Sequence, residues 1–110
     1  MRNKITDEIR IKHILDAIDE IESYTKDADL KMFTSNSMMF NATLRQLEVI
    51  GEAANKLSNH FLEQTNHIPW ARIIGLRNLI IHEYFGVDDI TIWNIVKLNL
   101  PELKKSIINM

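Results

Sequence analysis

Four side chains that could do chemistry together lie within eight residues: Arg77, Asn78, His82 and Tyr84. Projected at 100° per residue, Arg77 falls about 20° from Tyr84, near the centre of an arc of large apolar residues. The apolar residues of that arc are Trp70, Ile73, Ile74, Leu76, Ile80 and Ile81. Because burying an unpaired guanidinium there would be costly, we expect a carboxylate, a second subunit or an anionic ligand to meet it.

Arginine and histidine together suit metal-independent scission of RNA. A histidine with a pKa of about 6.5 can accept the proton of a ribose 2′-hydroxyl, and a second can protonate the leaving 5′-oxygen. The guanidinium can stabilise charge that develops on the phosphoryl group. Asn78 precedes His82 by four residues, so its amide can hydrogen-bond one imidazole nitrogen and fix the tautomer.

A single helix does not bring Arg77 and His82 together. Five residues diverge by about 140° around a helix and are separated by about 7.5 Å along it. If the stripe that carries Arg77 forms a two-fold interface, both arginines and both histidines line one cleft. The sequence therefore predicts a homodimer in which the subunit interface is also the active site.

The rest of the chain predicts the helices that position these residues. Apolar residues at helical spacing indicate a helix from Thr6, its N-cap, to about residue 24, and a connection with a short helical turn over residues 26–36. A long central helix is predicted over residues 37–63, with Gly51 permitting close approach of a neighbouring helix.

Two further helices complete the predicted fold. Pro69 is expected at the first position of a third main helix that ends at about Phe85 before Gly86. Asp88 or Asp89 caps a last helix, which Pro101 should break or kink before a final turn or two. The prediction is an all-α, up-and-down bundle of four to five helices.

Composition limits the class of protein. A chain of 110 residues is long enough for one helical domain, which we expect to span residues 1–110, and 45% of its residues are hydrophobic. Without cysteine, an apolar leader or a membrane-length apolar run, a cytoplasmic protein with no membrane contact is expected. The net charge of −2 provides no global attraction for nucleic acid, so we expect no DNA partner and only local contact with RNA. His13, His60 and His67 lack metal-ligand spacing, so neither a metal nor a cofactor is expected.

The run from Arg77 to Tyr84 resembles the R-x4-H-x-Y signature of the HepT-like toxins of the HEPN superfamily. Four further blocks resemble that family in order and spacing: LEVIGEAANKLS (47–58), IPWARIIGLRN (68–78), HEYFGVD (82–88) and LPELK (100–104). The resemblance implies a homodimeric ribonuclease toxin with Arg77 and His82 catalytic and Asn78 supporting them. It also implies a minimal nucleotidyltransferase antitoxin, of the MntA type, that transfers AMP from ATP to Tyr84. The added phosphodiester would occupy the arginine and repel RNA.

Each residue also has a structural interpretation. Without the resemblance, Arg77 is better explained by an ion pair with Glu48 or Glu52 of the central helix. His82 could complement the dipole at a helix C-terminus, and Tyr84 could be an ordinary core-edge residue. Glu52 could line the cleft or form a solvated pair with Lys56. The alternative function is a non-catalytic module that binds a nucleotide or docks a nucleotidyltransferase.

Overall fold

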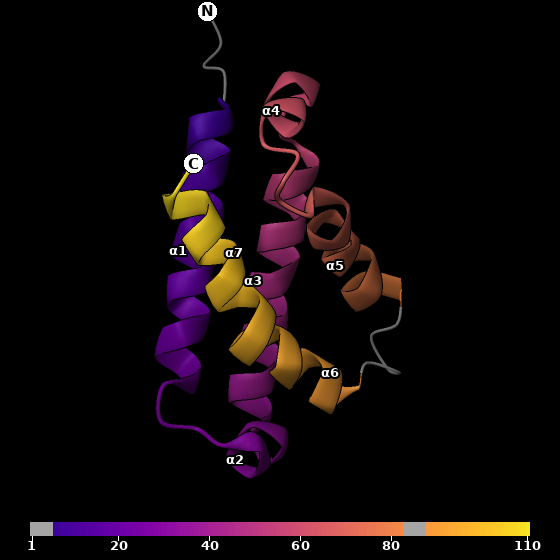
Figure 1. The fold of residues 1–110 in the computed structure, drawn as a ribbon. Helices are drawn as coiled ribbons and strands as arrows, with labels where there is room; N and C mark the ends of the chain where they lie inside the picture. The colour runs from indigo at the N-terminus through magenta and orange to yellow at the C-terminus, as the bar shows by residue number, and fades with distance from the viewer. Residues whose placement is uncertain (1–5, 83–87) are drawn as a thin grey trace, which may run out of the picture.

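The computed structural model describes residues 6–82 and 88–110, and every element of secondary structure in these residues is a helix. Its elements are α1 (Asp7–Thr25), α2 (Leu30–Ser35), α3 (Ser37–Asn55), α4 (Asn59–Gln64), α5 (Trp70–His82), α6 (Asp89–Asn94), a π-helical segment (Ile95–Asn99) and α7 (Leu100–Ile108). Figure 1 shows α1, α3 and α5 side by side in alternating directions, with α6 and α7 returning across them. The prediction of an all-α fold is confirmed for the described residues, which form six helices, with α6 to α7 counted as one, and not the predicted four to five.

Helix α1 forms as its sequence predicts. The Thr6 hydroxyl accepts a hydrogen bond from the Ile9 amide at 3.3 Å, and Asp7 and Glu8 occupy the positive first turn. Its buried residues recur at helical spacing and include Ile14, Ile18 and Ile21, all fully enclosed. Helix α1 packs on α3, and these residues form part of the hydrophobic core.

The predicted central helix over residues 37–63 is wrong at its C-terminal end. Helix α3 ends at Asn55, and a separate short helix, α4, begins at Asn59 with Ser58 as its N-cap. The Asp7 carboxylate accepts hydrogen bonds from the Ser58 amide at 2.8 Å and the Ser58 hydroxyl at 2.7 Å. This tertiary contact favours the break, because the same hydroxyl also accepts from the Phe61 amide at 3.1 Å and caps α4. The described chain therefore has six helices, two of them short, if α6 to α7 is counted as one.

The crossing of α3 and α5 confirms the role predicted for Gly51. A Cβ atom at Gly51 would lie 2.8 Å from the backbone nitrogen of Arg77 and 3.2 Å from the carbonyl oxygen of Ile73. Only a residue without a side chain permits so close an approach. The two helices therefore meet where α5 carries Arg77.

Helix α5 begins one residue later than predicted, at Trp70. Pro69 precedes it and accepts hydrogen bonds from the Arg72 and Ile73 amides, so Pro69 is the capping residue and not the first helical one. The predicted end near Phe85, before Gly86, lies outside the described residues. Trp70 is buried, and its indole nitrogen donates to the Thr65 hydroxyl at 2.8 Å.

The last helix is capped by Asp88, as predicted, through hydrogen bonds from the Ile90 amide and the Thr91 hydroxyl. Of the break or kink predicted at Pro101, the break does not occur, since the chain stays helical from Asp89 to Ile108. A π turn over Ile95–Asn99 precedes the proline instead, and the Leu100 amide donates to the Ile95 carbonyl. The wider turn accommodates proline, which has no amide hydrogen and carries a bulky ring.

None of the helices in the described parts of the chain is both long enough and apolar enough to cross a membrane.

Candidate active site

Arg77 and Glu52 form the central contact of the candidate site. Nε of Arg77, on α5, lies 2.5 Å from Oε2 of Glu52, on α3. The other oxygen of Glu52, Oε1, lies 3.4 Å from Nζ of Lys56, one turn further along α3. One carboxylate therefore contacts two cations, and of the two roles left open for Glu52 the pair with Lys56 is present, while the role in lining a cleft stays a prediction.

This ion pair changes the interpretation of Arg77. The arginine side chain is 41% exposed and that of Glu52 is 42% exposed, so the guanidinium lies at the edge of the apolar stripe and not within the core. An exposed pair of this kind contributes about 0–1 kcal/mol to stability. Burial alone therefore does not require a second subunit to meet Arg77.

The pairing geometry leaves part of the guanidinium available for another anion. Glu52 engages Nε, and among the side chains that the structure describes no other ion pair to Arg77 is found. The terminal amino groups Nη1 and Nη2 can still donate to two oxygens of one phosphate, the bidentate arrangement typical of arginine. An arginine whose Nε is held by a carboxylate and whose terminal amino groups can still donate is suited to bind a phosphodiester.

The other predicted site residues are only partly described. Asn78 is exposed on α5 next to Arg77, and His82 is the last residue of the described helix. The side chain of His82 and the whole of Tyr84 lie outside the described residues, as does the predicted hydrogen bond between Asn78 and His82.

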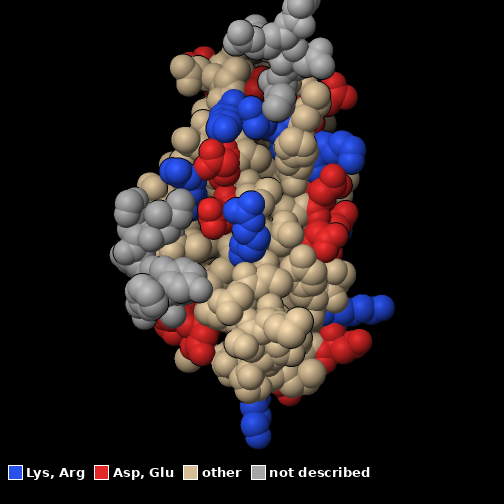
Figure 2. Space-filling view, turned by 180° about the vertical axis from the view of Figure 1, so that it is seen from behind, with Lys and Arg blue, Asp and Glu red and all other residues tan. Residues whose placement is uncertain are grey.

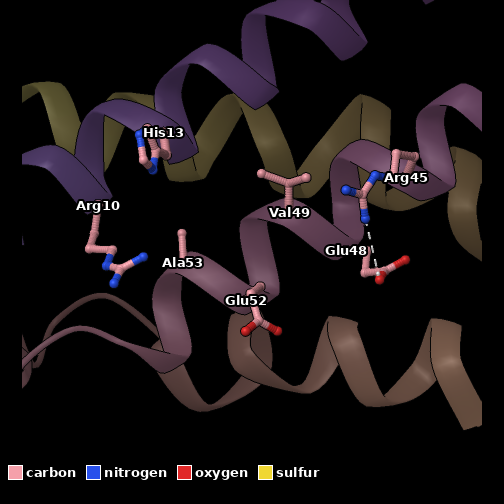
Figure 3. A pocket seen from close by; sticks show the side chains of 7 residues that line it. All are labelled: Arg10, His13, Arg45, Glu48, Val49, Glu52 and Ala53. Carbon is pink, nitrogen blue, oxygen red and sulfur yellow. Dashed lines mark hydrogen bonds and ion pairs between the residues drawn. The ribbon is translucent and has the colours of Figure 1, made fainter. Parts of the chain in front are cut away.

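A hollow of about 240 Å³ lies between α1 and α3 (Figure 3). It was not predicted from the sequence. Arg10 and His13 reach it from α1, and Arg45, Glu48 and Glu52 from α3, with Val49 and Ala53 between them. Glu52 is thus shared between this hollow and the pair with Arg77. Arg10 is a charged residue on the flank of an amphipathic helix, which in the sequence looks like any solvated cation.

A second hollow, of about 380 Å³, lies between α5 and the last helix. Its walls are mainly apolar and include Ile73 and Leu76 from α5, and Leu100 and Leu103 from α7. Leu76 remains partly exposed there, as do Ile74 and Leu79 on the same helix. Helix α5 therefore keeps apolar surface in contact with water on either side of Arg77.

Among the described side chains, the two whose pKa values are shifted, Asp7 and Lys104, do not contact Arg77. Hydrogen bonds from the Ser58 hydroxyl and amide lower the pKa of Asp7 below its ordinary value. Hydrogen bonds to Glu22 and Asp19 raise the pKa of Lys104. Among the described residues, no group of three histidine or carboxylate side chains is placed to hold a metal ion.

Comparison with known proteins identifies the class to which this helical protein with a paired, half-exposed arginine belongs. The family model described as "Ribonuclease HepT-like" matches residues 14–110. "Putative RNase MJ1380" of Methanocaldococcus jannaschii is 43% identical over 94 residues, which cover 86% of each chain. "Putative RNase MJ0125" of the same organism is 44% identical over 92 residues, covering 84% of this chain and 79% of the relative.

A relative from another archaeon carries the family name itself. "Probable ribonuclease HepT" of Thermococcus cleftensis is 36% identical over 94 residues, again 86% of each chain. No solved structure matches the chain. The protein belongs to the HepT-like ribonuclease family, as the sequence motif predicted.

Proposed function

We propose that this protein is a metal-independent endoribonuclease toxin whose activity depends on Arg77 and His82. The observation that carries the proposal is the arginine itself: Glu52 holds its Nε at 2.5 Å, and 41% of the side chain remains exposed. An arginine held in one orientation can bind a phosphate without first being reoriented. Family membership supports RNA as the polymer that supplies the phosphate.

The proposed reaction is an internal transfer at phosphorus. One histidine accepts the proton of the 2′-hydroxyl as the 2′-oxygen bonds to phosphorus, and the bond from phosphorus to the 5′-oxygen breaks. A second histidine protonates the departing 5′-oxygen, which gives a 2′,3′-cyclic phosphate and a 5′-hydroxyl. Arg77 stabilises charge on the two non-bridging oxygens. Acid–base catalysis of this kind contributes about 10² to 10⁴ in rate.

Two histidines at one phosphate require two copies of His82, since each chain carries one at this position. We therefore retain the homodimer as part of the proposal. The partly exposed Ile74 and Leu76 on α5 support it, because they lie within about 100° of Arg77 around the helix and would be buried by a second subunit. In such an assembly the cations and imidazoles of both chains would face one RNA strand.

Regulation by a minimal nucleotidyltransferase antitoxin completes the proposed function. Tyr84 follows His82 by two residues, so AMP attached to its hydroxyl would place a phosphodiester within reach of the arginine. Coexpression with a cognate minimal nucleotidyltransferase should add the mass of one or more AMP units to the peptide that contains Tyr84. An unmodified Tyr84 in a protein that is nevertheless silenced would contradict this mode of control.

A non-catalytic binding module is the second candidate, and one observation favours it. Arg77 already has a carboxylate partner in its own chain, as a purely structural cation would. Expression in cells separates the two functions: an enzyme should arrest growth, and Arg77→Ala or His82→Ala should each relieve the arrest. A wild-type protein that is harmless when expressed alone would favour the binding module.

A further inference from the structure

The hollow between α1 and α3 is lined by charged groups that the proposed reaction does not use. Arg10 and His13 approach it from α1, and Arg45 approaches it from α3 (Figure 3). Its volume of about 240 Å³ is sufficient for a phosphate group with part of its ribose. The hollow adjoins the candidate active site, since Glu52 lines it and also pairs with Arg77.

The lining itself has two arginines and two glutamates, and positive charge exceeds negative charge once the two cations that pair with Glu52 are counted. Its two carboxylates are both neutralised: Glu52 by Arg77 and Lys56, and Glu48 by Arg45 at 3.5 Å. Arg10 has no carboxylate partner among the described residues, and its Nε makes no hydrogen bond there. Seen from behind, the molecule shows basic and acidic side chains interleaved (Figure 2).

Such an excess is informative in a chain whose net charge is −2. Without a global positive field, an RNA strand must be held by local clusters of cations. A half-buried arginine without a partner meets that need, because it forms charge-assisted hydrogen bonds to phosphate without breaking an existing ion pair. The exposed Arg45, 69% accessible and held loosely, can turn toward the same ligand.

We propose that the hollow between α1 and α3 binds a backbone phosphate of the RNA strand adjacent to the phosphate that Arg77 engages. Arg10 is its principal ligand and Arg45 the second, and Glu52 separates the two phosphate positions. This inference rests on the proposed function, because it names where the substrate of that same site continues. It assigns substrate binding to α1, a helix outside the R-x4-H-x-Y motif.

The test uses a short single-stranded RNA in which every 2′-hydroxyl is methylated, so that binding is measured without cleavage. Arg10→Gln should weaken binding about fivefold or more, and Arg45→Glu by a similar factor. The slope of log affinity against log salt should fall by about 0.7 for each phosphate that the protein no longer neutralises. Arg10→Lys, which retains the charge, should keep most of that slope.

Lys12→Gln is the matched control. It removes a cation from the same helix two residues beyond Arg10, on a side chain that is 73% exposed and paired with Asp16. Its affinity and salt slope should equal those of the wild type, apart from the small decrease common to any removed charge. Arg45→Glu changes an exposed side chain, so it reports on the hollow even if Arg10→Gln unfolds the protein.

Unchanged affinity in Arg10→Gln and Arg45→Glu, an equal decrease in Lys12→Gln, or no binding by the wild type would each overturn the subsite. Cleavage separates this outcome from failure of the proposed function. If unmodified RNA is cut in a reaction that depends on Arg77 and His82, and Arg10→Gln has the same KM as the wild type, only the subsite is wrong. If methylated RNA binds through Arg10 but unmodified RNA is never cut, the subsite stands and the ribonuclease activity does not.

Discussion

Gly51 and Arg77 are in direct backbone contact: a Cβ at Gly51 would lie 2.8 Å from the Arg77 nitrogen and 3.0 Å from its Cβ. The next residue of α3, Glu52, pairs with the guanidinium of the same arginine. Two consecutive residues of α3 thus fix both the backbone and the side chain of Arg77. The position of the proposed catalytic cation is therefore a property of how α3 and α5 cross.

The contact at Gly51 predicts the effect of one added methyl group. Gly51→Ala should separate α3 from α5 and destabilise the protein by about 1–3 kcal/mol, the usual cost of overpacking. It should also lower RNA cleavage, since Arg77 moves with the backbone of α5. Urea unfolding and a cleavage assay measure the two effects.

Gly75→Ala is the matched control, because Gly75 lies on α5 two residues before Arg77 and a methyl group there would meet nothing within 4 Å. At this position alanine should stabilise the helix by up to about 1 kcal/mol through its higher helix propensity. Similar effects of the two substitutions would show that the α3–α5 crossing does not depend on Gly51.

Glu52 is expected to orient Arg77 rather than to stabilise the fold. Glu52→Gln should change the free energy of unfolding by less than about 1 kcal/mol, because both partners are over two-fifths exposed. It should lower kcat about tenfold while KM changes less, since the arginine loses its fixed orientation. Glu48→Gln, which removes the carboxylate paired with Arg45, should leave kcat unchanged. A normal kcat in Glu52→Gln would exclude the orienting role.

The contact between Asp7 and Ser58 predicts a pH dependence of stability. The pKa of Asp7 is lowered in the folded state, from an ordinary value of 3.8, chiefly by the hydrogen bond from the Ser58 hydroxyl. Its contribution is therefore present above pH 3.8 and is lost as the pH falls through the lowered folded pKa. Asp7→Asn should cost about 1 kcal/mol at pH 7, and the difference from the wild type should shrink in strong acid.

Thermal unfolding across that pH range measures the effect, with Glu8→Gln as the control. Glu8 shares the first turn of α1, so the control removes the same interaction with the helix dipole without disturbing Ser58. If both variants lose the same stability, the hydrogen bonds to Ser58 contribute nothing.

Assembly is tested by mass in solution. Sedimentation at micromolar concentration should give twice the formula mass of 12.9 kDa. Arg77→Glu should weaken the dimer, because it removes the cation that pairs with Glu52 and leaves two adjacent carboxylates in each subunit at the two-fold interface, whereas Lys12→Glu on α1 should not. A wild-type monomer under these conditions would contradict a cleft shared by two subunits.

The fold was predictable wherever neighbouring residues determine it. The caps Thr6 and Asp88 satisfy amides two or three residues away, and the apolar spacing of α1 is visible in the sequence. The break after Asn55 was not predictable, because the contact that favours it joins Asp7 to a residue 51 positions away. The π turn before Pro101 was missed for a related reason: a proline signals an interruption but not the form it takes.

The candidate site was likewise predictable only where spacing along one helix determines it. Helical spacing placed Glu52 on the flank of the central helix, which made it a possible partner for Arg77, and that ion pair is present. Spacing could not place Arg10 beside Glu48 and Glu52, because their proximity arises from the packing of α1 on α3. The arrangement of His82 and Tyr84 around Arg77 stays a prediction.

The central claim, that Arg77 and His82 cut RNA without a metal ion, is tested most directly by the purified protein with RNA in excess EDTA. The wild type and Lys12→Gln should cleave and leave 2′,3′-cyclic phosphate ends, while Arg77→Ala and His82→Ala should each be slower by at least about 10². Equal cleavage by all four proteins, or none by the wild type, would contradict this claim.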